Sequence, residues 1–193
     1  EDPEAALSTV ERLLEDYETG PMLSVRTGPN TPPVNTSTAC CEAISDFVDA
    51  HPEVGVSAHV AESLPILEQV REEHGAEGVA AYLDEVGLSG PDCVYAHCVH
   101  LTGGEVELLA DNGSAVSHNP VSNMMLGDGV ALLLDMLERG VTVGLGTDGA
   151  ASTQTQDMVE TLKGDSMMAK NAHNDPAVVD AYDLLELATV GGA

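Results

Sequence analysis

Basic residues are scarce in this sequence of 193 residues. Six lysines and arginines stand against 33 aspartates and glutamates, which gives a formal net charge of −27 with neutral histidines. The acids are spread over the expected helices and form no tail, so the whole surface should repel the phosphates of nucleic acids and of anionic membranes. Lysine occurs only as Lys163 and Lys170. This favours a halophilic protein over an ordinary acidic one, because molar salt shortens the Debye length to about 3 Å and screens self-repulsion.

Long apolar segments are also absent. No run approaches the roughly 20 residues that a membrane-spanning helix needs, and no stretch resembles a signal peptide. The four cysteines, Cys40, Cys41, Cys93 and Cys98, do not suit a disulfide framework, because the adjacent pair cannot easily bridge. We therefore expect reduced, buried thiols in a soluble, cytoplasmic protein.

The stretch 141–152, VTVGLGTDGAAS, is an apolar, β-branched run that stops at Thr147-Asp148-Gly149. Such a run is typical of a buried parallel strand. An acid at the carboxyl end of a strand lies where α/β proteins keep their chemistry. Asp148 is therefore a candidate functional residue.

Three earlier apolar runs end in a histidine, at His59, His97 and His118. Together with Asp148, successive members of this series lie 38, 21 and 30 residues apart, which suits units of one strand, one crossover helix and a loop. One histidine at a strand end is more often structural than a ligand, but recurrence at the same structural position favours function. The sequence thus predicts three imidazoles and one carboxylate on a common rim.

The rest of the chain alternates between helices and strands. Helical periodicity predicts helices over 3–18, 36–50, 105–110, 129–138, 155–170 and 176–188, and one or two more over 64–85. A short strand is expected over 22–25 and a long loop over 119–129. With no linker, residues 1–193 should form a single α/β domain with a parallel sheet or barrel. A complete (β/α)8 barrel takes about 250 residues, so a barrel here would be partial.

The remaining histidines are less informative. His51, His74 and His173 fall in expected helix ends or loops and are interpreted as surface residues, and His100 is ambiguous.

Several familiar motifs can be weighed against this interpretation. Residues 144–149 match G-x-G-x-x-G, but Asp148 would oppose a pyrophosphate, and no following strand offers a ribose-binding acid, which disfavours a nucleotide-dependent oxidoreductase. The P-C-x-x-C motif that cytidine-type zinc deaminases combine with H-x-E is absent, as is H-E-x-x-H. Imidazoles and a carboxylate on strand ends remain, and they suit zinc or iron in a catalytic site.

Three linked stretches carry a resemblance to a known family. HVAES at 59–63, YAHCVHLTGGEVELLADNGSAVSHNPVSNMMLGDG at 95–129 and GVTVGLGTDGAAS at 140–152 resemble the amidohydrolase superfamily. The similarity is to its branch of S-adenosylhomocysteine/methylthioadenosine deaminases, guanine and cytosine deaminases and triazine hydrolases. The resemblance implies a distorted (β/α)8 TIM-type barrel, one divalent metal, zinc in preference to iron, and hydrolytic deamination of an aminated purine or related small heterocycle.

The resemblance also implies roles for individual residues. His59 matches a metal ligand, and Asp148 matches a carboxylate that binds the metal and acts as general base. Glu62 matches the acid that contacts the ring nitrogen of the substrate and shuttles a proton, while His97 matches the histidine that holds the attacking water. In the SHNPxSN loop, His118 and Asn123 match positions that line the substrate pocket.

One feature of the family is missing. The family draws two further metal ligands from an H-x-H on its first strand, and this sequence contains no H-x-H. The chain is expected to correspond to strands four to eight with their helices, to bind metal weakly on its own through His59 and Asp148, and to need an amino-terminal segment or an oligomeric partner. The alternative is a catalytically inactive α/β fragment that serves as an assembly partner.

Overall fold

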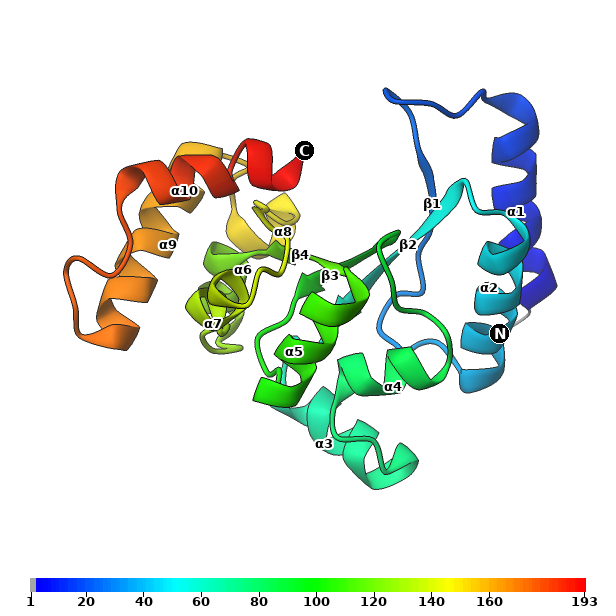
Figure 1. The fold of residues 1–193 in the computed structure, drawn as a ribbon, viewed down its shortest axis with the longest axis horizontal. Helices are drawn as coiled ribbons and strands as arrows, with labels where there is room; N and C mark the ends of the chain where they lie inside the picture. Colours follow the sequence, from blue (N-terminus) through cyan, green and yellow to red (C-terminus); the bar gives the residue numbers. More distant parts are fainter. Residues whose placement is uncertain (1–2) are drawn as a thin grey trace.

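The computed structural model describes residues 3–193 and contains a five-stranded parallel sheet with helices around it (Figure 1). The strands are β1 (Val25–Thr27), β2 (Val54–Val60), β3 (Cys93–His97), β4 (Ala115–His118) and β5 (Val143–Leu145). Each strand pairs in parallel with the next one in sequence. This sequential order is that of a (β/α)8 barrel, whereas the order reverses within a doubly wound sheet. The strands form a segment of a barrel, in agreement with the predicted fold class.

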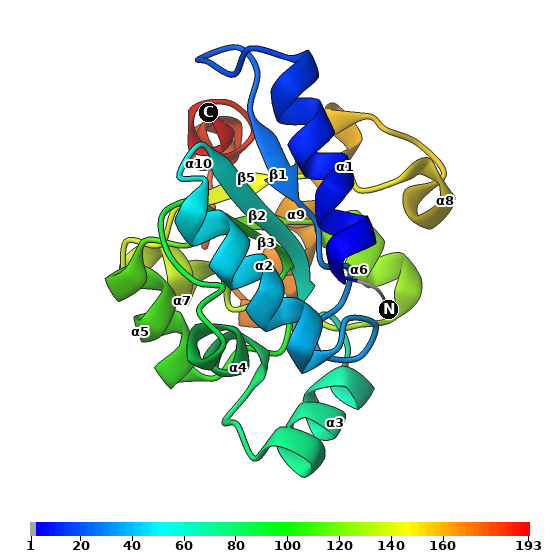
Figure 2. The same ribbon diagram turned by 90° about the vertical axis from the view of Figure 1, so that its right-hand side faces the viewer.

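One helix precedes the first strand, and helices follow every strand. They are α1 (Pro3–Asp16), α2 (Thr38–Ala50), α3 (Leu64–His74), α4 (Val79–Glu85), α5 (Gly103–Asn112), α6 (Pro120–Leu126), α7 (Leu133–Glu138), α8 (Ala150–Thr153), α9 (Met158–His173) and α10 (Ala181–Leu187), with a 3-10 turn at Val190–Gly192. Figure 1 shows α1 and α2 at the β1 end of the sheet and α9 and α10 at the β5 end. In Figure 2, α2, α4, α5 and α7 succeed one another along one side of the strands.

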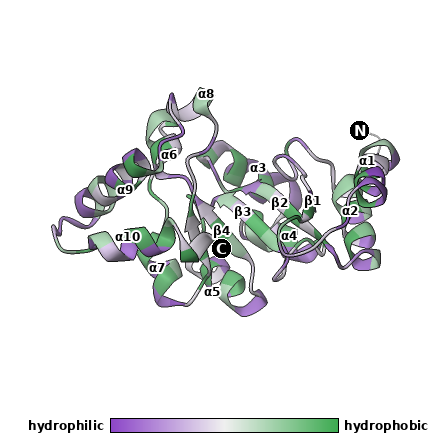
Figure 3. Cartoon of the chain, turned by 90° about the horizontal axis from the view of Figure 1, so that it is seen from above, coloured by the Kyte–Doolittle hydropathy of each residue, from purple (hydrophilic) through white to green (hydrophobic). Residues whose placement is uncertain are grey.

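The sheet has two different faces because side chains alternate along a strand. In β2, Val56, Ala58 and Val60 are buried in the main hydrophobic core, whereas Ser57 is exposed and His59 is partly exposed. The helices contribute the other half of that core through residues such as Leu83, Val106, Leu109 and Met136. Hydrophilic stretches lie on outer helices such as α1 and α9 (Figure 3). The core therefore lies between sheet and helices, and the opposite face is left for polar and small residues.

Two local predictions are wrong. Residues 119–129 are not a continuous loop, because Pro120 stands at the start of α6, where its fixed φ favours a helix, and Gly127 ends that helix with φ of 77°. The first strand lies at Val25–Thr27 instead of 22–25, since Leu23 pairs with Gly20 in an isolated antiparallel bridge.

All four cysteines are free and buried, as predicted. Burial raises the pKa of the Cys93 thiol to about 11, so this thiol is poorly reactive at neutral pH. Within residues 3–193, every helix is too short or too polar to cross a bilayer.

Candidate active site

Four of the predicted residues lie at or just after the carboxyl ends of strands, and His118, the last residue of β4, is one of them. His59 is the penultimate residue of β2, His97 is the last of β3, and Asp148 follows the end of β5 by three residues. His97 and Asp148 have φ angles of 73° and 59°. Such a left-handed backbone costs about 1–3 kcal/mol in a residue other than glycine and is concentrated at functional sites. Simple alternation would place His97 on the helix side with Tyr95, and the left-handed backbone instead turns its ring to the ring of His59.

The two histidine rings are stacked, with centroids 5.4 Å apart and planes inclined by 19°. His59 Nδ1 lies 2.8 Å from the backbone carbonyl oxygen of Asn30. A carbonyl can only accept, so this contact places the proton of the neutral His59 ring on Nδ1. The Nε2 lone pair is thereby left available to a metal, which is the usual arrangement of a metal-binding histidine.

His97 stands between two polar side chains. Its Nε2 lies 3.5 Å from Glu62 Oε1, and its Nδ1 lies 2.9 Å from Asn123 Oδ1. The His97 and Asn123 side chains are buried, but 21% of the Glu62 side chain is exposed. Of Glu62, His97 and Asn123, Glu62 is thus the residue that can reach a molecule in solvent.

Asp148 accepts two hydrogen bonds. The Ser122 hydroxyl donates to its Oδ2 at 2.5 Å, and the backbone N–H of Gly149 donates to its Oδ1 at 2.6 Å. Burial raises the pKa of Asp148, but these hydrogen bonds and the nearby His97 and His59 outweigh it and hold the pKa below its ordinary value. The carboxylate is therefore ionised at neutral pH and close to both histidines.

His118 is placed differently. It lies on the same face of β4 as the core residue Val116, is completely buried, and its Nε2 lies 3.2 Å from Oδ1 of the equally buried Asp165 of α9. In the described part of the chain, no hydrogen bond or ion pair joins it to His59, His97 or Asp148. The structure thus brings together His59, Glu62, His97, Asn123 and Asp148, and it leaves His118 in the helix layer. Its placement does not support a role in lining a substrate pocket.

Three partners of these residues were not predicted from the sequence: Asn30, Ser122 and Asp165. Ser122 belongs to the SHNPxSN motif, which was a signal available in the sequence. Asn30 acts through its backbone carbonyl, and Asp165 lies on a distant helix, so neither could be recognised from residue type or spacing.

His59 and Asp148 can offer a divalent metal one imidazole nitrogen and one carboxylate oxygen, ligands that suit zinc. Within residues 3–193, no group of three or more His, Cys, Asp or Glu side chains is placed to hold a metal ion. A catalytic zinc site usually has three protein ligands. The residues present therefore fit part of such a site.

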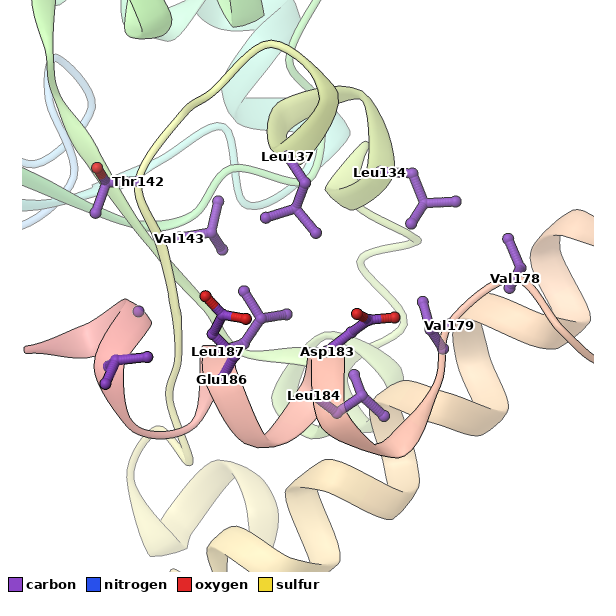
Figure 4. Close-up of a pocket in the computed structure, with 12 residues that line it drawn as sticks. Leu134, Leu137, Thr142, Val143, Val178, Val179, Asp183, Leu184, Glu186 and Leu187 are labelled. Atoms are coloured by element: carbon purple, nitrogen blue, oxygen red, sulfur yellow. The ribbon is translucent and has the colours of Figure 1, made fainter.

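A cavity of about 420 Å³ lies elsewhere, between α7, β5 and α10 (Figure 4). Its walls are mostly aliphatic, for example Leu137, Val143 and Leu187, and none of the candidate residues lines it. One of its carboxylates, Asp183, already accepts the N–H of Asp180 at the start of α10. We interpret it as a packing gap between helices and sheet.

Two glycines of the G-x-G-x-x-G match also have a packing role. A Cβ at Gly144 would lie 2.8 Å from the Cα of Gly192, and a Cβ at Gly146 would collide with Asn119 Oδ1 and lie 2.7 Å from Ser117 Oγ. These close approaches explain Gly144 and Gly146 without a bound phosphate, whereas a Cβ at Gly149 would meet nothing within 4 Å.

Comparison with known proteins agrees with this geometry. Residues 2–193 match the amidohydrolase family. A 5'-deoxyadenosine deaminase of Methanopyrus kandleri is 44% identical over 137 residues, which cover 71% of this chain and 32% of that protein. A 5-methylthioadenosine/S-adenosylhomocysteine deaminase of Haloarcula marismortui is 38% identical over 163 residues, or 83% of this chain and 38% of that protein.

Solved structures give the same result. An adenosine deaminase from Xanthomonas campestris with bound zinc superimposes with a TM-score of 0.90 at 28% identity, over 97% of this chain and 42% of that one. E. coli guanine deaminase superimposes with a TM-score of 0.91 at 28% identity, over 100% of this chain and 44% of that one. The chain spans about a third of the length of the curated relatives it matches. The family match and the barrel-segment fold lead to one conclusion: the chain belongs to the amidohydrolase family.

Proposed function

We propose that the chain is the catalytic part of a metal-dependent hydrolase that removes an amino group from a purine or a related heterocycle. The observation that carries the proposal is the row of His59, His97, Glu62 and Asp148 at the carboxyl ends of neighbouring strands, with an ionised carboxylate beside two oriented imidazoles. Relatives named as deaminases of 5'-deoxyadenosine, 5-methylthioadenosine and S-adenosylhomocysteine support the reaction type. In this proposal, residues 1–193 form one partial barrel domain equivalent to strands four to eight.

His59 and Asp148 would hold the metal, and the structure prepares His59 for this by its contact with Asn30. Zinc is favoured over iron, because the structurally similar adenosine deaminase from Xanthomonas campestris has bound zinc. The two remaining ligands would come from an H-x-H on a first strand that this sequence does not contain. We therefore expect the 193-residue polypeptide alone to bind zinc weakly and to need such a segment for activity.

When bound, the metal supplies a water whose pKa is lowered to about 7. The Asp148 carboxylate would accept a proton from the attacking water, since its lowered pKa keeps it ionised. His97, whose Nε2 faces Glu62, would orient the water toward the ring carbon that bears the amino group. Glu62, partly exposed beside His97, gives a proton to the adjacent ring nitrogen. The amino group would leave as ammonia with the proton that Asp148 accepted, and the hydroxyl proton on the attacked carbon would pass to Glu62 as the carbonyl forms.

The test needs the missing strand. A chimera can join the amino-terminal region of the Haloarcula marismortui relative to this chain at the start of their matched region. With zinc in about 3 M KCl, a salt level that screens the acidic surface, we expect ammonia release from 5'-deoxyadenosine or 5'-methylthioadenosine. The same chimera with His59→Ala should lose zinc and activity. A folded, zinc-loaded chimera that releases no ammonia from these nucleosides, guanine or an aminotriazine would contradict the proposed function.

We further propose that the enzyme works in a salt-rich cytoplasm. The net charge of −27 and the four free, buried cysteines support this environment.

Stability should accordingly rise with salt. Raising KCl from 0.1 M to about 3 M shortens the Debye length from about 10 Å to below 3 Å and weakens repulsion between surface carboxylates. We expect the melting temperature of the chain to increase by about 10 °C or more, in line with a few kcal/mol of relieved repulsion. Circular dichroism at a series of KCl concentrations measures this, and a melting temperature independent of salt would contradict a halophilic protein.

A further inference from the structure

Two adjacent residues of α6 contact two different members of the candidate site. Ser122 donates its hydroxyl to Asp148 Oδ2, and Asn123 offers Oδ1 to His97 Nδ1. Both side chains have no exposed surface. The two residues cannot reach a substrate without leaving these contacts, and their hydrogen bonds are already directed at the groups that would handle the water.

The contact with Asn123 determines which nitrogen of His97 carries the proton. The amide Oδ1 can only accept, so Nδ1 is the donor and Nε2 of the neutral ring keeps its lone pair. That lone pair lies on the Glu62 side of the ring, 3.5 Å from Oε1. A ring with the opposite tautomer would present an N–H to this side instead of an acceptor.

Helix α6 itself is held closely against α9. A Cβ at Gly164 would lie 2.8 Å from Val121 Cγ2 and 3.4 Å from Met124 Cε, so α6 packs directly on the α9 backbone. The next residue, Asp165, pairs with the buried His118 at the end of β4, immediately before α6. These contacts fix both the start of α6 and its distance from α9.

We propose that α6 is a positioning element, in which Asn123 fixes the tautomer of His97 and Ser122 fixes the orientation of Asp148. One turn of helix thereby sets the relation between two side chains whose left-handed backbones are intrinsically unfavourable. The catalytic consequence rests on the proposed function, but the tautomer does not. Asn123, expected from the sequence to contact substrate, is in this proposal a residue that acts through His97.

The direct test is the ¹⁵N NMR spectrum of the histidine rings in the 193-residue chain, without metal, in about 3 M KCl and at alkaline pH. The His97 signals can be assigned by their loss in His97→Gln. We expect the Nδ1–H tautomer in the native chain, a shift toward Nε2–H in Asn123→Leu, and recovery in Asn123→Asp, whose carboxylate oxygen also accepts. Met125→Leu on the exposed side of α6 is the control and should leave the spectrum unchanged.

Either of two results would overturn the proposal: an Nε2–H tautomer in the native chain, or an unchanged His97 spectrum in folded Asn123→Leu. The tautomer of His97 in the native chain can be measured even if Asn123→Leu fails to fold. In the chimera, Asn123→Leu and Ser122→Ala should each lower kcat about 10- to 100-fold, as removal of residues behind a metal site does, with little change in KM. A raised KM with unchanged kcat would instead indicate substrate contact. Because the tautomer requires neither metal nor turnover, an inactive chimera would count against the proposed function alone.

Discussion

Replacing Asp148 by asparagine in the chimera should lower kcat about 10²- to 10⁴-fold, the range that a positioned general base contributes. Asparagine keeps the shape of the side chain and an oxygen that can accept from Ser122, but it cannot take a proton from water. Burial opposes ionisation of Asp148, yet the hydrogen bonds from Ser122 and Gly149 and the neighbouring histidines lower its pKa. The native side chain is therefore available as a base at neutral pH, and steady-state ammonia release measures its loss.

The matched control is Asp111→Asn, which removes the same charge from an exposed position on α5. It should retain native kcat and KM. If Asp148→Asn also retained native kcat, the proton acceptor would have to be another group, and the assigned mechanism would be wrong.

Replacing Glu105 by alanine should lower the free energy of unfolding by about 3–5 kcal/mol, the cost of uncompensated buried polar groups. Glu105 is only 1% exposed. Its carboxylate accepts the N–H of Thr102 at 2.9 Å, which completes the start of α5, and the N–H groups of Ala80 at 2.8 Å and Ala81 at 3.3 Å at the start of α4. One side chain thus caps two helices, and its removal leaves their N–H groups without partners.

Urea denaturation of the 193-residue chain at constant KCl measures the effect. Glu107→Ala on the same helix is the control, because the Glu107 side chain is 68% exposed and its Oε1 lies 3.8 Å from Arg139 Nε; such surface pairs contribute about 0–1 kcal/mol. Gly78→Ala should also destabilise the chain, since its Cβ would collide with the Glu105 carboxylate. Equal urea midpoints for Glu105→Ala and Glu107→Ala would show that the hydrogen bonds of Glu105 to the starts of α4 and α5 do not contribute to the free energy of unfolding.

The sequence predicted the strand ends well because apolar runs and their spacing are local properties. His59, His97 and Asp148 lie where those runs end, and the parallel order of the strands brings them to one edge. Apolar runs and their spacing do not identify the partners Asn30 and Ser122, since their contacts depend on how a loop and a short helix return to the sheet; only the SHNPxSN motif offered a signal for Ser122. The left-handed backbone of His97 has no signature in residue type either.

For His118, the alternation of side chains along the strand was itself enough to predict the position that the structure shows. Val116 and His118 are two residues apart and so share one face of β4, and Val116 is a core residue. The alternation of the strand therefore already placed His118 among the helices, whereas the analogy with His59 and the SHNPxSN motif placed it at the pocket. Helix α6 was missed for a related reason, because Asn119, Pro120 and Gly127 also suit a loop.

We expect His59 and Asp148 to hold a metal at the carboxyl ends of β2 and β5. Zinc K-edge X-ray absorption of the chimera, with and without His59→Ala and Asp148→Ala, tests it most directly. We expect one zinc with nitrogen and oxygen ligands at about 2.0–2.2 Å, and loss of that zinc in either variant. A zinc bound through sulfur at about 2.3 Å, or a zinc signal unchanged in both variants, would contradict it.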